Sequence, residues 1–186
     1  MTARTELWDV AVEQHGYFTL VDAKTLGLDD MTVRMMARRQ HLEHAARGVW
    51  RFPSLPATPA DPYQLAVLWT GAPEAALSHE TALAVRELGD VNPDRIHVTV
   101  GKLRRIRRAR PGPYAVHCED VAAADLGWWE GIRTVSAAKA IAQCIELGTP
   151  THLLRQALEE GRRTGALTTA QGGALNHKLE TRHGKS

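Results

Sequence analysis

Five arginines lie close together between residues 34 and 51, where the chain could perform recognition chemistry. Arg34, Arg38 and Arg39 fall in a segment of helical character, whereas Arg47 and Arg51 flank a glycine in a segment typical of two short strands. A guanidinium group is planar, and its paired N–H donors match phosphate oxygens and the O6 and N7 atoms of guanine. The spacing therefore predicts a surface that contacts a polyanion.

A helix that begins at Asp30 and runs to Gln40 would separate the arginines from the apolar residues between them. At helical spacing, Val33, Met36 and Ala37 share one face, which we expect to be buried. The remaining surface of the helix carries the candidate base-contacting residues Arg34, Met35, Arg38 and Arg39. A solvated helix face that binds nothing is the alternative interpretation. The position between a turn and a strand pair favours a helix that reads DNA.

The segments around this helix predict a winged helix-turn-helix. A first helix should end near Gln14, and a second should run from Thr19 to Gly27. After the third helix, two strands with a turn at residues 46–48 would form the wing, so Lys24, Arg47 and Arg51 are expected to contact phosphates. Residues 1–52 hold as many cations as anions, so DNA affinity should be modest and salt-sensitive.

Four prolines between residues 53 and 62 predict a stiff linker without a core of its own. The expected organisation is α+β, with a winged helix-turn-helix domain at 1–52, the linker at 53–62 and a mixed domain at 63–186. In the second domain, residues 96–100 and 114–118 alternate in the manner of strands. Two helices should precede these strands, and three should follow residue 136.

The loop between these two strands contains the strongest concentration of positive charge in the chain. The net charge is +2, but this basic loop (Lys102–Arg110) has six cations and no anion, so the rest of the chain is net acidic. Three interpretations stay open: contact with DNA backbone, pairing with an acidic protein partner, or a solvated hairpin tip. The candidate DNA contacts within it are Lys102, Arg104, Arg105, Arg107 and Arg108.

Catalytic and metal-binding signals are weak in comparison. His79-Glu80 begins an H-E-x-x-H pattern, but Leu83 stands where the second histidine is required. The nine histidines are scattered, so we expect no metal site and no cofactor. Because no carboxylate cluster with a lysine falls on successive strands, we also expect no enzymatic activity. Cys118 and Cys144 are expected to be reduced thiols in the core. Trp128-Trp129 predicts either core or edge packing or, if exposed, an anchor for a protein partner.

No apolar run approaches the roughly 20 residues of a membrane helix. The first ten residues contain charges and lack the apolar segment of a secretory signal, so a cytoplasmic protein without membrane contact is expected.

Several segments resemble one known family. The stretch "GYFTLVDAKTLGLDDMTVRMMARRQHLEHAARGVWRFP" is similar to the amino-terminal winged helix of the AbiEi-type antitoxins of bacterial toxin–antitoxin systems. Further along, "LSHETALAVREL", "RIHVTV" and "GIRTVSAAKAIAQCIE" resemble later segments of that family in the same order. The chain departs from the family where Lys139-Ala140 replaces a common Arg-Thr and where Gln40 replaces a common glycine.

This resemblance implies an antitoxin that binds and neutralises a cognate nucleotidyltransferase-like toxin and represses its own operon by binding operator DNA. It does not imply which residues contact the toxin, nor the oligomeric state. The alternative is a stand-alone winged-helix regulator whose second domain dimerises or senses a ligand.

Overall fold

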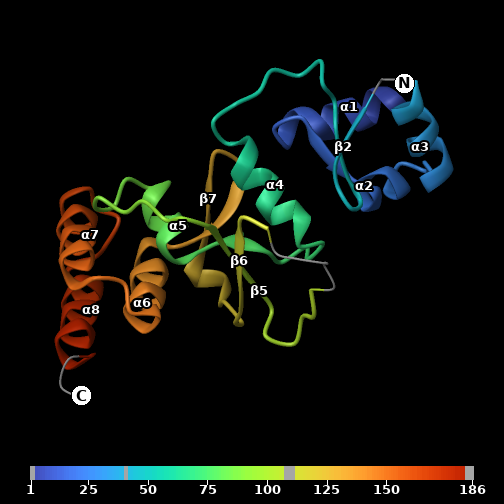
Figure 1. Ribbon diagram of the computed structural model, residues 1–186. Coiled ribbons are helices and arrows are strands. Elements are labelled where there is room, and N and C mark those ends of the chain that lie inside the picture. Colours follow the sequence, from blue (N-terminus) through green and yellow to red (C-terminus); the bar gives the residue numbers. More distant parts are fainter. Residues whose placement is uncertain (1–2, 40–41, 107–111, 183–186) are drawn as a thin grey trace. The chain divides into compact units, whose positions relative to one another are not determined.

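The computed structural model describes residues 3–39, 42–106 and 112–182, which fold into two compact units (Figure 1). The first unit contains residues 1–73 with 130–132, and the second contains residues 74–129 with 133–186. No helix within the described ranges is long and apolar enough to cross a membrane.

The first unit contains the predicted winged helix-turn-helix. Its first three helices are α1 (Ala3–Glu13), α2 (Leu20–Thr25) and α3 (Asp30–Arg38). Its strands are β1 (Tyr17–Thr19), β2 (Glu43–Ala46) and β3 (Val49–Arg51), in the antiparallel order β1-β3-β2. The two wing strands were expected, whereas β1 was not, because three residues are too few for an alternating pattern.

One core holds this unit together. Phe18 and Phe52 are almost completely buried, with ring centroids 5.5 Å apart, and Leu7 of α1 and Val33 of α3 pack into the same cluster. Burial of such apolar side chains stabilises a fold by roughly 1.5–3 kcal/mol each. The core therefore fixes the buried side of α3 against the sheet.

The proline-rich segment packs against the first unit, which differs from the predicted linker and domain boundary. Arg51 donates hydrogen bonds to Leu55 O at 3.0 Å and to Asp61 Oδ2 at 3.3 Å, and Asp61 in turn accepts from Thr58. Helix α4 (Asp61–Trp69), predicted to open the second domain, contacts β1, β2 and β3 instead. Composition alone showed that the segment is stiff, but not that side chains hold it in place.

The second unit contains a five-stranded mixed sheet of order β6-β5-β4-β8-β7. Its strands are β4 (Ala76–Leu77), β5 (Ile96–Val100), β6 (Tyr114–Cys118), β7 (Leu126–Trp129) and β8 (Ile132–Val135). A short 3-10 turn, η1 (Ala123–Asp125), precedes β7. Trp128 on the edge strand β7 is 65% exposed, with the Arg133 guanidinium over its ring at 5.6 Å.

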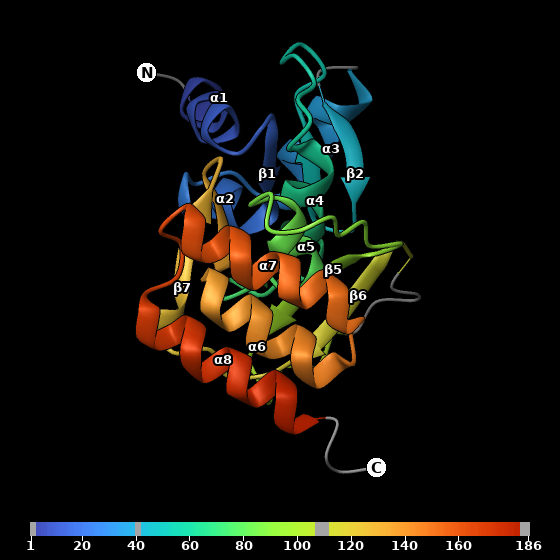
Figure 2. The same ribbon diagram turned by 90° about the vertical axis from the view of Figure 1, so that its left-hand side faces the viewer.

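Four helices complete this unit: α5 (His79–Ala84), α6 (Ala137–Leu147), α7 (Thr151–Arg163) and α8 (Thr169–Arg182). The last three pack on one another and lie side by side in both views (Figure 2). Ser136 caps α6 and Gly148 ends it in the left-handed conformation, as predicted. Leu154 and Leu158 of α7 are buried in the main core.

Three expectations for this unit require correction. Strands β5 and β6 pair in parallel and so do not form a hairpin, which removes the hairpin tip from the three interpretations of the segment between them. Cys118 is exposed because it ends β6, while Cys144 is buried as expected. Three of the supposedly scattered histidines meet at one place, because sheet pairing joins segments that the sequence separates; they are His79, His97 and His117.

Candidate nucleic-acid interface

Local hydrogen bonds define both helices of the helix-turn-helix. Thr19 and Asp22 form a capping box at the start of α2, and Asp29 Oδ1 accepts the Thr32 N–H at 2.7 Å at the start of α3. The hydrogen bonds from Thr32 lower the pKa of the Asp29 carboxyl, which favours its charged form at the positive helix end. Gly27 makes the turn possible with φ +77°.

Helix α3 has the two faces that the sequence predicts. Val33 is completely buried, and Met36 and Ala37 are partly buried against the first core. On the opposite side, Met35 is 44% exposed, and the three arginines are exposed. Together with Met31, these residues form what we name the arginine face: Met31, Arg34, Met35, Arg38 and Arg39.

Among the described residues, no acid forms an ion pair with the guanidinium groups of this face. Within the part of the chain that the structure describes, no ion pair involves Arg34, Arg38 or Arg39. Arg47 lies exposed in the turn between β2 and β3, the predicted tip of the wing. Arg34, Arg38 and Arg39 therefore keep their donors available for an external anion.

Two predicted phosphate contacts are placed differently. Lys24 pairs with Asp30 at 3.4 Å, yet its side chain remains 63% exposed. Arg51 pairs with Asp61, and their side chains are only 13% and 11% exposed. Its guanidinium therefore holds the proline-rich segment in place, and we remove Arg51 from the candidate interface.

Two residues of this surface were not predicted: Met31, which belongs to the arginine face, and Arg4, which lies beside it. Met31 is 64% exposed, and a helical-wheel count places it one turn before Arg34 and Met35, so the sequence contained that signal. Arg4 of α1 lines a hollow of about 350 Å³ together with Thr32 and Arg39. The approach of α1 to α3 is a tertiary contact, which helical periodicity alone does not predict.

The basic loop of the second unit is partly paired. Arg104 makes two hydrogen bonds to Glu74, with Nε at 2.8 Å and Nη2 at 2.7 Å, and this contact raises the pKa of Arg104. Lys102 and Arg105 are exposed. The predicted contacts Arg107 and Arg108 lie outside the described residues, as does Arg110.

The comparison with protein families agrees with this geometry in the first unit. Residues 7–53 match the family model described as "Transcriptional regulator, AbiEi antitoxin". No curated protein matches the chain. Among solved structures, the RV2827C protein from Mycobacterium tuberculosis aligns at 18% identity with a TM-score of 0.46, covering 96% of this chain and 82% of that chain.

The family match spans the capped helices α2 and α3, the arginine face and the wing, which are the segments that carried the sequence resemblance. The prediction of an AbiEi-type winged helix is therefore confirmed for this part of the chain. Residues 7–53 are thus similar to the AbiEi antitoxin family of transcriptional regulators.

Proposed function

We propose that the protein is a non-enzymatic antitoxin that represses its own operon through α3 and neutralises a cognate nucleotidyltransferase-like toxin by binding it. The observation that supports the DNA-binding half best is the arginine face, which lies opposite the buried Val33 on a capped helix. A helix with this division can enter the major groove while its apolar side stays in the core.

Each side chain on this face has a chemical partner in DNA. Arg34 and Arg38 lie one turn apart and can each reach a guanine with two hydrogen bonds. The exposed Met35 between them offers an apolar surface for a thymine methyl group. Lys24 and Arg47 flank the helix and would contact phosphates, which position the protein without reading sequence.

Fluorescence anisotropy with a duplex from the region upstream of the gene tests this half of the proposal. We expect Arg34→Ala and Arg38→Ala each to weaken binding roughly 5- to 150-fold, since a bidentate arginine–guanine pair contributes about 1–3 kcal/mol. Arg155→Ala is the matched control, because Arg155 is an exposed arginine on α7 of the second unit. The control should bind like the unchanged protein.

Binding to a duplex of scrambled sequence distinguishes recognition of the bases from nonspecific attraction to phosphates. If the affinity of the two α3 variants falls by the same factor on both duplexes, the arginines contact phosphates only. If they bind the upstream duplex as tightly as the control does, α3 is not the reading helix and the DNA half of the proposal is wrong.

The toxin half is supported by the family description of residues 7–53 and by a second unit that has its own sheet and core. Co-expression with the product of the neighbouring gene should give a complex that co-purifies and restores growth. Arg34→Ala should leave growth rescue intact, because we assign that residue to DNA. Operator binding without any complex or rescue would favour the stand-alone regulator instead.

A further inference from the structure

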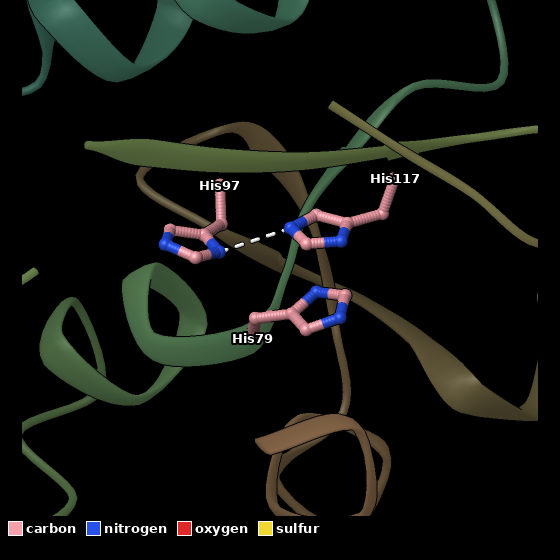
Figure 3. A group of neighbouring side chains, drawn as sticks. All are labelled: His79, His97 and His117. Carbon is pink, nitrogen blue, oxygen red and sulfur yellow. Dashed lines mark hydrogen bonds between the residues drawn. The ribbon is translucent and has the colours of Figure 1, made fainter. Parts of the chain in front are cut away.

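Three histidine side chains from three elements of the second unit face one another (Figure 3). His79 begins α5, His97 lies on β5 and His117 lies on β6. Nδ1 of His97 is 3.0 Å from Nε2 of His117, and the rings of His79 and His117 stack with centroids 3.6 Å apart. One ring nitrogen from each of the three lies within 4.8 Å of the others. We name these residues the histidine cluster.

Strand register explains why these residues meet. In the parallel pair β5–β6, His97 is opposite Ala115 and Thr99 is opposite His117, so the two histidines project from the same face of the sheet. Strand β4 pairs with β5 and leads directly into Ser78, whose N–H donates to His97 O at 3.1 Å. The next residue is His79, which is thereby brought to the same place.

The backbone and side-chain partners of His79 hold it in an uncommon conformation. Its φ is +50°, in the left-handed region, which costs a non-glycine residue about 1–3 kcal/mol. Its N–H donates to Gln143 Oε1 at 3.2 Å, and its Nδ1 lies 3.0 Å from Ser78 Oγ. A polar partner on the second ring nitrogen, such as Ser78 here, is typical of histidines that bind metal ions.

The cluster holds neutral imidazoles, and a carboxylate near it already has other partners. His79 is only 7% exposed, and burial together with the neighbouring imidazoles lowers its pKa to about 3. The nearby carboxylate of Glu119 is already engaged by Lys139 and Gln143. The 3.0 Å contact between His97 Nδ1 and His117 Nε2 is a hydrogen bond, so one of these nitrogens carries a proton. When that proton moves to the other nitrogen of its ring, each neutral imidazole can offer a lone pair to a metal ion.

The spacing fits a tetrahedral metal ion. A Zn²⁺–nitrogen distance of about 2.0–2.1 Å places two histidine nitrogens about 3.4 Å apart. The His97–His117 distance of 3.0 Å is already close to this value. The other separations are within 4.8 Å and would have to close by rotation of the imidazole rings, whose terminal torsion has broad wells.

One side of the cluster borders open space. His79 and His117 line a cleft of about 770 Å³ with Lys102, Cys118, Glu119 and Asp120. The cleft gives an ion a route of entry and leaves room for a fourth ligand, as in zinc sites with three protein ligands.

We propose that His79, His97 and His117 form a binding site for a divalent transition-metal ion such as Zn²⁺, with the fourth coordination position toward the cleft. The ligand set is all imidazole, which suits Zn²⁺, Cu²⁺ and Ni²⁺ better than Mg²⁺ or Ca²⁺. The proposal concerns the second unit and does not depend on DNA binding.

Zinc titration of the chelator-treated full chain tests the site, with a chromophoric chelator as competitor. We expect one equivalent of Zn²⁺ to bind, and the melting temperature to rise with added Zn²⁺ because the ion binds only the folded state. His97→Gln and His117→Gln should each weaken binding by more than 100-fold and abolish the rise. His152→Gln should change neither, because His152 is exposed on α7.

Co²⁺ in place of Zn²⁺ identifies the ligands. The visible bands of tetrahedral Co²⁺ should appear without a sulfur-to-metal charge-transfer band, and Cys118→Ser should leave them unchanged. Absence of stoichiometric binding overturns the proposal. So does binding that survives both histidine substitutions, or that is lost only with Cys118→Ser, since the ion would then be held by the exposed thiol. Circular dichroism of each variant confirms that it is folded.

Discussion

The arginine face and the histidine cluster are built in opposite ways. The arginine face lies on one helix and presents cationic groups to solvent, opposite a buried Val33. The histidine cluster collects imidazoles from three elements and turns them inward, where His79 is 7% exposed. The first arrangement suits a large external polyanion, whereas the second suits a small cation.

The two sites also differ in what holds their side chains in place. On α3, the capped backbone and the core beneath Val33 position the arginines, so their own side chains need no internal partner. In the cluster, the histidines contact each other and Ser78, so each side chain helps to position the next. Single substitutions should therefore act locally on α3 and cooperatively in the cluster.

The largest effect is expected from placing a charge on the buried side of α3. Val33→Asp buries a carboxylate without a partner and should destabilise the first unit by about 3–5 kcal/mol, with loss of DNA binding. Val21→Asp is the matched control: it makes the same substitution at a side chain that is 72% exposed in the first turn of α2, where the helix end favours the charge. Urea unfolding measures both, and similar losses for the two variants would contradict the two-faced helix.

The next largest effect is expected from acid acting on the metal-free histidine cluster. Burial and the neighbouring histidines hold the pKa of His117 at about 4 and that of His79 at about 3, while unfolded imidazoles titrate near 6.5. Between these values the unfolded chain binds more protons, so stability should fall as pH drops from about 6.5 toward 3. Above that window the histidines should contribute no pH dependence.

Melting temperatures recorded from pH 7.5 to pH 4.5 check this expectation. Around the cluster, Lys139 and Arg95 repel additional positive charge, while Glu80 and Glu119 attract it. For each variant, the change in melting temperature is measured from that variant's own value at pH 7.5. His117→Asn should flatten the curve and His152→Gln should not; equal slopes for the two variants would assign the acid sensitivity to other groups.

The two sites also differ in how far the sequence could predict them. A period of 3.6 residues was enough to separate Val33 from Arg34 and Arg38, because the helix determines its own geometry. The same reasoning missed the histidine cluster, since His79, His97 and His117 are separated by 18 and 20 residues and meet only through sheet register. Strand alternation predicted β5 and β6 but not their parallel pairing.

Arg51 illustrates a related limit. The sequence placed it on the wing with Arg47, and the strand was correct. Its partner Asp61 lies ten residues later, near the end of the proline-rich segment, which offered no periodic signal. A charged residue can be assigned to solvent or to an internal pair only when the path of the intervening chain is known.

A middle-sized effect is therefore expected from Arg51, and on stability alone. Arg51→Ala leaves Asp61, which is 8% exposed, without its cation and should cost about 3 kcal/mol in the free energy of unfolding. Arg47→Ala, on the exposed turn, should cost less than about 0.5 kcal/mol. Arg51→Ala combined with Asp61→Asn should recover part of the loss.

DNA anisotropy on the folded variants completes this comparison. We expect Arg47→Ala to weaken binding and Arg51→Ala to leave it unchanged once the unfolded fraction is subtracted. If folded Arg51→Ala protein bound DNA as weakly as an α3 variant does, Arg51 would have to be counted among the DNA contacts.

The smallest effect concerns the basic loop, where paired and exposed cations lie side by side. Arg104 is held by Glu74, whereas Lys102 and Arg105 are exposed. If the exposed pair contacts DNA backbone, the double substitution to alanine should reduce the slope of log affinity against log salt by up to about 2, since each phosphate contact contributes about 0.9. Arg104→Ala should alter the slope less, because Glu74 already offsets that charge. An unchanged slope with weakened toxin binding would assign the loop to the protein partner, and the arginine face would then be the main DNA contact.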